Sequence, residues 1–212
     1  MSRGRQCTRV RDGQACAGIL LTGGASRRLG RDKASLIVEG ETLARRTGRL
    51  LVAVCELAVE VGPGRSGLPS VLESPRGGGP LAGLLAGERW LALQGYRGPV
   101  LLVATDLPRL HVELLAQLRD VATSGSVLPV VDGRSQPLLA RWSPEDLDEA
   151  HRQWARGERS LRFLGERPEV LHWDRAHWAP AIRPQDFADV DTPEDARDLG
   201  LRGALGEERS WH

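Results

Sequence analysis

The chain has 212 residues, of which 41% are hydrophobic and 27% charged, and its formal net charge is +1. This balance predicts a soluble protein whose core needs no disulfide or metal, with 1–16 a disordered basic extension, 17–200 one domain and 201–212 a loose tail. The small net charge argues against nucleic acid as a partner, and no apolar run is long enough to span a membrane. Three cysteines without zinc spacing, Cys7, Cys16 and Cys55, favour a reducing cytoplasm.

The first predicted element is a short buried strand from 17 to 21. Thr22, Gly23 and Gly24 follow, where missing side chains let backbone N–H groups face a ligand. The next ten residues are strongly basic, and they contain Arg27, Arg28, Arg31 and Lys33. Lys33 is the only lysine in the chain, which indicates a geometric need for a compact point charge, with codon bias as the alternative. We therefore predict a phosphate-binding loop, whose spacing excludes the Walker A and Rossmann fingerprints.

The loop Leu21-Thr-Gly-Gly-Ala-Ser-Arg-Arg-Leu-Gly-Arg-Asp-Lys-Ala34 resembles the nucleotidyltransferase signature L-x-G-G-x-S-x-R-M-G-x-D-K. It is most similar to that of the molybdenum cofactor guanylyltransferase family. Leu29 stands where the family usually has Met, a swap of similar volume. The resemblance implies an α/β fold, a three-layer α/β/α Rossmann-like arrangement with a mostly parallel central sheet. It also implies that Leu21 to Gly24 and Lys33 bind nucleotide, and that Arg28 and Lys33 offset charge on the leaving pyrophosphate.

The next elements alternate between helix and strand. Apolar spacing predicts a helix over 43–54, and buried strands are expected over 58–61 and 71–73. This alternation predicts a parallel sheet with helices on its faces. Glu73, at the end of the third strand, is expected to face the base or ribose of a nucleotide.

A glycine-rich stretch, Arg76-Gly-Gly-Gly-Pro-Leu-Ala-Gly83, precedes a helical run from 81 to about 93. Gly79 to Gly83 matches the segment that lies against the purine base in the guanylyltransferases. The resemblance therefore makes Gly79, Pro80 and Leu81 nucleotide-binding residues. The alternative is a flexible loop leading into a helix that begins with proline.

The run Val100 to Ala104 is the most strand-like in the chain, continuous and apolar as in a central parallel strand. Asp106 follows at the carboxyl end, where open α/β sheets place their ligands. In the family the matching Asp binds Mg²⁺, and Thr105 stands where Cys is common. The alternative is that Asp106 caps a helix beginning near Val112.

The second half of the chain contains fewer candidate functional residues. Strands are predicted over 127–131, 136–141 and 170–173, and a capped helix begins at Ser143-Pro144 with His151 at the edge of the core. The stretch Arg159 to Leu164 resembles the family's S-L-x-x-F-L. Trp173 and Trp178 are expected to pack rather than to stack on a ligand.

The last motif is Phe187-Ala-Asp-Val-Asp-Thr-Pro-Glu-Asp195, in which Thr192 should cap a helix and Asp195 complete a capping box. Asp189 and Asp191 precede the cap and are candidate acceptor-binding residues. Asp191 is also a candidate second Mg²⁺ ligand, although support for the Thr192 cap is slightly preferred. The guanylyltransferases usually have Asn at both positions, and the related cytidylyltransferases have Asp. The chain contains no asparagine, which weakens that difference.

The resemblance implies transfer of GMP from GTP to the phosphate of molybdopterin or molybdenum cofactor, with release of pyrophosphate. Mg²⁺ is the implied cofactor, and molybdoenzymes or cofactor-delivery proteins are candidate partners. Two alternatives are kept. One is a relative that uses CTP with molybdopterin, or another nucleotide with a sugar phosphate, and the other is an idle nucleotide-binding adaptor that delivers cofactor.

Overall fold

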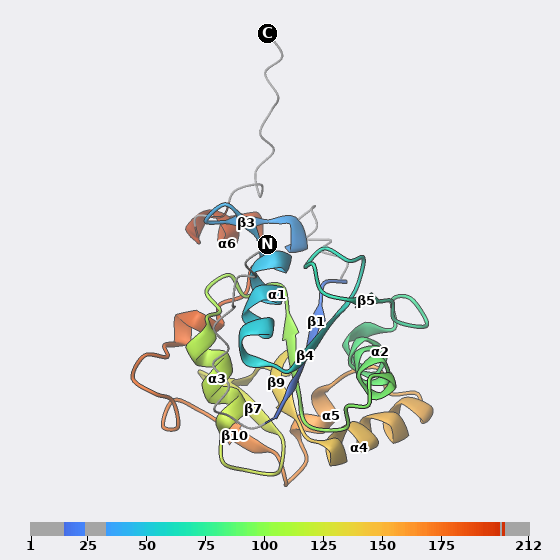
Figure 1. Cartoon of the computed structure of the whole chain (residues 1–212). Helices are drawn as coiled ribbons and strands as arrows, with labels where there is room; N and C mark the ends of the chain where they lie inside the picture. The colour runs from blue at the N-terminus through green and yellow to red at the C-terminus, as the bar shows by residue number, and fades with distance from the viewer. Residues whose placement is uncertain (1–14, 24–32, 200, 202–212) are drawn as a thin grey trace, which may run out of the picture.

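A computed structural model describes residues 15–23, 33–199 and 201, and within these residues the fold is a mixed sheet between two layers of helices (Figure 1). The sheet has eight strands, and its main path runs β10-β7-β9-β6-β1-β4-β5 with β8 paired to β7. All strands of that path run parallel except β9, which is antiparallel to both β6 and β7. The predicted three-layer α/β/α fold is therefore confirmed.

The strands follow from short apolar runs bounded by turn residues. They are β1 (Ala17–Leu21), β2 (Ile37–Val38), β3 (Glu41–Thr42), β4 (Leu57–Val61), β5 (Ser70–Val71), β6 (Val100–Ala104), β7 (Val127–Val131), β8 (Arg134–Ser135), β9 (Leu139–Trp142) and β10 (Leu171–Trp173). The small hairpin of β2 and β3 turns at Glu39 and Gly40, which both have positive φ.

The helices begin at recognisable caps, for example Thr42, Ser143 and Thr192, whose side chains each accept a backbone N–H. They are α1 (Leu43–Val54), α2 (Gly79–Leu93), α3 (Val112–Asp120), α4 (Pro144–Ala155), α5 (Arg162–Gly165) and α6 (Pro193–Asp198), with 3-10 turns η1 (Lys33–Ser35) and η2 (Pro184–Phe187).

Two apolar clusters cover the two faces of the sheet. Ile19 points to the side of α2, α4 and α5, whereas Leu20 points to the side of α1 and α3, as alternation along a strand requires. Complete burial of one such side chain stabilises the fold by roughly 1.5–3 kcal/mol. Trp173 is buried in the second cluster and Trp178 stacks on Phe187, so both tryptophans pack as predicted.

Several predicted boundaries need correction. The third strand pairs over Ser70–Val71 and ends before Glu73. The strand expected over 136–141 pairs only from Leu139, because Gln136 forms a turn. His151 of α4 is exposed and bonds to Glu88 of α2, so it lies at the rim of the contact between these helices, in agreement with its predicted place at the core edge.

The structure also extends the domain beyond its predicted ends at residues 17 and 200. Cys16, placed in the extension, is buried in the core, and Leu201, placed in the tail, is 7% exposed and packs on Leu36 and Leu43. Ala15, also placed in the extension, is exposed, and residues 1–14 and 202–212 lie outside the described residues.

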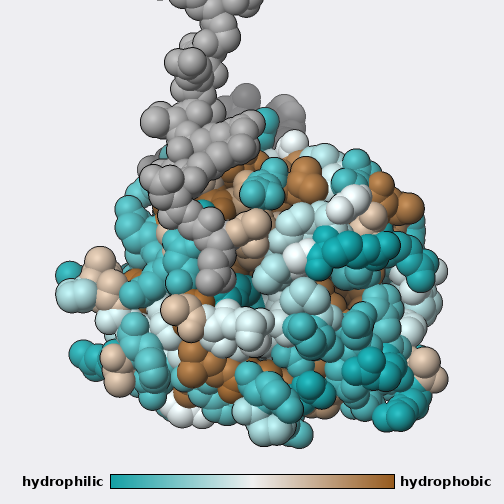
Figure 2. Space-filling model, turned by 60° about the horizontal axis from the view of Figure 1, so that its bottom comes forward, coloured by the Kyte–Doolittle hydropathy of each residue, from teal (hydrophilic) through white to brown (hydrophobic). Residues whose placement is uncertain are grey.

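The face shown in Figure 2 is mostly hydrophilic, with hydrophobic residues in separate areas. In the part of the chain that the structure describes, no helix is both long and apolar enough to cross a membrane.

Candidate active site

The site is built where the strand order reverses, at the carboxyl ends of β1 and β6. The chain places β4 on one side of β1 and β6 on the other, with Leu21 beside Val61 and Ala104. Thr105 donates its backbone N–H to the Leu21 carbonyl oxygen at 3.2 Å. The loops that follow β1 and β6 therefore begin side by side, at the position where open α/β sheets bind ligands.

A cluster of one lysine and two aspartates lies at this edge. Lys33 Nζ is 2.5 Å from Asp191 Oδ1 and 3.4 Å from Asp106 Oδ2. The Lys33 and Asp106 side chains are only 18% and 22% exposed, so the pair is shielded from water more than an ordinary surface ion pair. The structure thus brings together three of the predicted site residues from distant parts of the chain.

The pKa values of this cluster reflect burial and opposite charge. Burial raises the pKa of Asp106 above its ordinary value, and the charge of Lys33 offsets only part of this. Burial lowers the pKa of Lys33, but the hydrogen bond to Asp191 and the charge of Asp106 raise it by more. Lys33 therefore stays charged at neutral pH.

The segment before α6 is fixed to the loop after β6. Val190 donates its backbone N–H to the Asp106 carbonyl oxygen at 3.0 Å, and Asp189 lies close enough to raise the pKa of Asp106. Thr192 and Asp195 form the predicted capping box. Asp191 supports this cap through its backbone, whose N–H donates to Asp195 Oδ2 at 3.0 Å, while its carboxylate lies outside the box and pairs with Lys33. Asp106 is no cap, because His111 caps α3.

Glu60, in β4, is a buried residue at this edge that the sequence analysis missed. It is 0% exposed, and its carboxylate accepts hydrogen bonds from Thr22, Gly64, Arg65 and Ser66. Burial raises the pKa of Glu60, but the hydrogen bonds from Ser66, Thr22 and backbone N–H groups lower it by more, below its usual range. The available signal was a single carboxylate in the strand Leu-Ala-Val-Glu-Val.

The glycine-rich segment forms the amino end of α2. Gly79 has a φ of 82°, a conformation that favours glycine, and Pro80 follows in the first turn. The Leu81 side chain is buried in the core, so only its backbone can face a ligand. Glu73 accepts a hydrogen bond from the Gly77 backbone N–H at 2.8 Å, which holds this loop to the end of β5.

The remaining predicted residues divide into two groups. Thr22 and Gly23 lie at the same edge as Lys33 and Asp106, beside the carbonyl of Val61. Gly24 and Arg28, with the neighbouring Arg27 and Arg31, lie outside the described residues. Where these arginines stand relative to the site therefore stays a prediction.

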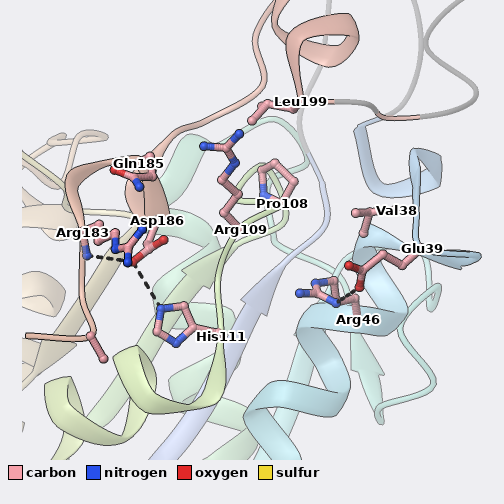
Figure 3. Close-up of a pocket in the computed structure, with 11 residues that line it drawn as sticks. Val38, Glu39, Arg46, Pro108, Arg109, His111, Arg183, Gln185, Asp186 and Leu199 are labelled. Carbon is pink, nitrogen blue, oxygen red and sulfur yellow. Dashed lines mark hydrogen bonds and ion pairs between the residues drawn. The ribbon is translucent and has the colours of Figure 1, made fainter.

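A pocket of about 640 Å³ is lined by residues from the β2–β3 hairpin and α1, from the loop between Asp106 and α3, and from the segment around η2, with Leu199 (Figure 3). Arg109 lies in its centre, between Arg46 and Glu39 on one side and Asp186 on the other. Two side-chain pairs lie in its lining, since Arg46 bonds to Glu39 at 3.3 Å and His111 to Asp186 at 3.3 Å. These pairs tie α1 to the hairpin and α3 to η2.

The oxygen donors of the cluster fit Mg²⁺, which prefers oxygen ligands and usually takes one or two carboxylates. Asp106 offers a half-buried carboxylate and Asp191 a second one nearby. Within the described residues, no group of three or more His, Cys, Asp or Glu could hold an ion alone. Nucleotide phosphates and water would therefore complete the shell.

Comparison with known proteins agrees with this geometry. A family model, the MobA-like NTP transferase domain, matches residues 18–177. A probable molybdenum cofactor guanylyltransferase of Opitutus terrae is 35% identical over 193 residues, covering 81% of this chain and 93% of that protein. The molybdenum cofactor guanylyltransferase of Rhodobacter capsulatus is 32% identical over 185 residues, covering 84% and 92%.

Solved structures support the fold. Molybdopterin-guanine dinucleotide biosynthesis protein A of Archaeoglobus fulgidus matches with a TM-score of 0.71 at 22% identity, covering 86% of this chain and 95% of that chain. A 4-diphosphocytidyl-2C-methyl-D-erythritol synthase of Anaerococcus prevotii matches with a TM-score of 0.62 at 14% identity, covering 88% and 95%. The chain therefore belongs to the molybdenum cofactor guanylyltransferase family, within the MobA-like NTP transferases.

Proposed function

We propose that this enzyme transfers GMP from GTP to the phosphate of molybdopterin or molybdenum cofactor and releases pyrophosphate. The observation that carries the proposal is the position of Lys33, held between Asp106 and Asp191 where the loops after β1 and β6 meet. Family membership supports the same reaction, since the curated relatives at 35% and 32% identity are named for it.

The reaction requires the protein mainly to align the two substrates and to neutralise the negative charge of their phosphates. An acceptor phosphate is an anionic nucleophile at neutral pH, so the reaction needs no dedicated base. Its oxygen forms a bond to the α-phosphorus of GTP, and the bond from that phosphorus to the bridging oxygen of pyrophosphate breaks. Lys33 remains protonated and offsets negative charge on the leaving pyrophosphate, and Arg28 is expected to add a second positive charge.

Asp106 would hold Mg²⁺, with Asp191 as the second candidate ligand. The ion would supply charge neutralisation at the α-phosphate. Lys33 stands between the two carboxylates and keeps them from repelling each other before the ligands arrive.

The nucleotide would lie across the amino end of α2. The first turns of α2 lie close to the end of β1, because a Cβ on Gly83 would lie 2.8 Å from Leu21 Cδ2, and Gly23, Gly79 and Pro80 are at least partly accessible. We propose that Gly79 to Leu81 contact the base through the backbone, while Glu73 acts by holding the loop at Gly77. Asp189, exposed beside Asp106, would face the acceptor.

The decisive experiment incubates the protein with Mg²⁺, molybdopterin and each of the four labelled nucleoside triphosphates, and follows pyrophosphate. We expect release with GTP only, dependent on both acceptor and Mg²⁺. Release with CTP would favour the cytidylyl alternative that Asp189 and Asp191 suggest. Binding without any release would favour the idle adaptor. Delivery partners and a cytoplasmic location stay predictions.

A further inference from the structure

Glu60 is a charged group in a place that would ordinarily hold an apolar side chain. It is 0% exposed and stands in β4, directly beside Leu20 of β1. A buried carboxylate is costly unless hydrogen bonds satisfy it, and an apolar residue of similar volume often stabilises such a site at least as well. The hydrogen-bond donors around the Glu60 carboxylate therefore indicate its role.

Five donors satisfy Glu60, and they come from two different loops. Oε1 accepts from the Thr22 hydroxyl at 2.5 Å and from the backbone N–H groups of Gly64 and Arg65 at 2.8 and 3.0 Å. Oε2 accepts from the backbone N–H and the hydroxyl of Ser66 at 2.7 and 2.6 Å. One carboxylate thus holds the loop after β4 against the first residue after β1.

Gly62 makes this close approach sterically feasible. A Cβ atom on Gly62 would lie 1.9 Å from the Thr22 hydroxyl oxygen and 3.2 Å from the Gly23 nitrogen. Thr22 also donates its backbone N–H to the Val61 carbonyl oxygen at 3.2 Å. The backbone of Thr22 and Gly23 is therefore held on two sides, by the end of β4 and by the buried carboxylate.

We infer that Glu60 is a positioning residue for nucleotide binding, acting through the Thr22 hydroxyl to set the backbone of Thr22 and Gly23 that faces the phosphates. Glu60 itself touches no ligand, since it is buried beneath the loop. The identity of the ligand rests on the proposed function, but the positioning role does not depend on which nucleotide binds.

The experiment compares four variants by calorimetric binding of the nucleotide that wild-type protein binds, together with thermal unfolding. Thr22→Val removes the hydroxyl at nearly constant shape, and Thr22→Ser keeps it. Glu60→Gln removes the charge. Ser66→Ala is the matched control, because it deletes a bond to the same carboxylate from the loop that lies away from Thr22.

We expect Thr22→Val and Glu60→Gln to raise the dissociation constant about tenfold, as the loss of a hydrogen bond to a charged group can. Thr22→Ser should restore binding to within about twofold, and Ser66→Ala should lower the melting temperature without weakening binding. Because both act through one bond, Thr22→Val should add little in a Glu60→Gln background.

Normal binding by a folded Thr22→Val protein would overturn the inference, as would equal weakening by Ser66→Ala. If Glu60→Gln fails to fold, the Thr22→Val and Thr22→Ser pair still decides the question. A wild-type protein that binds CTP and not GTP would contradict the proposed function. The positioning role would then be tested by comparing the same variants for CTP binding.

Discussion

At the scale of single residues, replacing Lys33 by arginine keeps the positive charge and changes only the shape of the cation. Its Nζ fits between Asp191 and Asp106, and its side chain is 18% exposed. Arginine has a longer planar fork that cannot occupy a point-charge site of this kind. We expect Lys33→Arg to restore little of the turnover lost in Lys33→Ala, measured as pyrophosphate release. Arg45→Ala, on the exposed side of α1, should leave turnover unchanged, and near-full activity of Lys33→Arg would contradict the prediction.

Asp106 and Asp191 should differ on mutation. Asp106→Asn keeps the shape and removes the charge, so turnover should fall by roughly two or more orders of magnitude, since a metal clamp is worth several kcal/mol in the transition state. Asp191→Asn should act mainly on acceptor affinity. Both effects are measured by varying Mg²⁺ and acceptor, and ordinary turnover with ordinary Mg²⁺ dependence in Asp106→Asn would refute the metal assignment.

Stability provides the control for Asp106→Asn. Burial raises the pKa of Asp106, so its ionised form opposes folding, and stability from this group falls as pH rises through the folded pKa. The asparagine variant should therefore unfold in urea no earlier than wild type at neutral pH. A loss of activity in Asp106→Asn would then reflect the loss of the proposed metal ligand and not unfolding.

Glu60 has the opposite pH dependence. Its folded pKa lies below the ordinary value of 4.5, so it contributes stability that is present above pH 4.5 and is lost as pH falls through the folded pKa. The free energy of unfolding of wild type should exceed that of Glu60→Gln at pH 7, and the difference should shrink below about pH 4.5. Urea unfolding at several pH values measures it, and a difference independent of pH would show that the charge is not involved.

The residues found from the sequence were those inside recognisable motifs. Lys33 and Asp106 could be predicted because a glycine-rich loop and a strand end mark them. The pairing of Lys33 with Asp191 could not, because 158 positions separate them and only the folded sheet edge brings them together. Glu60 was missed because a lone carboxylate in an apolar strand carries no motif.

At the scale of elements, α2 packs on β1 through two glycines. A Cβ on Gly83 would meet one flexible terminal atom, Leu21 Cδ2, at 2.8 Å, whereas on Gly87 it would meet three Ile19 atoms within 3.0 Å. Either alanine gains about 1 kcal/mol of helix propensity. Overpacking against fully buried Ile19 costs about 1–3 kcal/mol, so Gly87→Ala should destabilise and Gly83→Ala should be close to neutral. Urea unfolding compares them, and equal stabilities would contradict this account.

Element types could be predicted better than element pairings. The runs 17–21, 43–54, 100–104 and 127–131 have the predicted bounds because periodicity and turn residues mark both ends. The short β5 depends on pairing with Glu60 and Val61, which is not a local property. The antiparallel insertion of β9 between β6 and β7 is likewise a matter of topology, and no residue pattern within β9 signals it.

At the scale of the whole molecule, a small apolar cluster joins the carboxyl end of the described chain to residues between η1 and α1. Leu201 packs with Leu36, Leu43, Val190 and Ala196, beside the segment that carries Asp191. Leu201→Ala should destabilise by about 2 kcal/mol or more, as truncation of buried leucines does, and should also weaken acceptor binding by loosening this segment. Leu93→Ala, at a site 78% exposed, is the matched control. Urea unfolding and acceptor titration decide, and equal stability of the two variants would contradict the prediction.

The order of strands has a consequence for how the enzyme is made. The parallel neighbours β5, β4, β1 and β6 have all been synthesised once residue 104 is added, and the pairings among these four strands use no later residue, whereas β6 also pairs with the later strand β9. Asp191 leaves the ribosome 158 residues after Lys33. Because chains begin to fold during synthesis, the strands that carry the proposed nucleotide site can pair on the nascent chain while Lys33 has Asp106 as a partner but still lacks Asp191. The enzyme would thus acquire its acceptor side last, and a chain interrupted before residue 189 would retain the nucleotide-facing edge without the residues proposed to engage the acceptor.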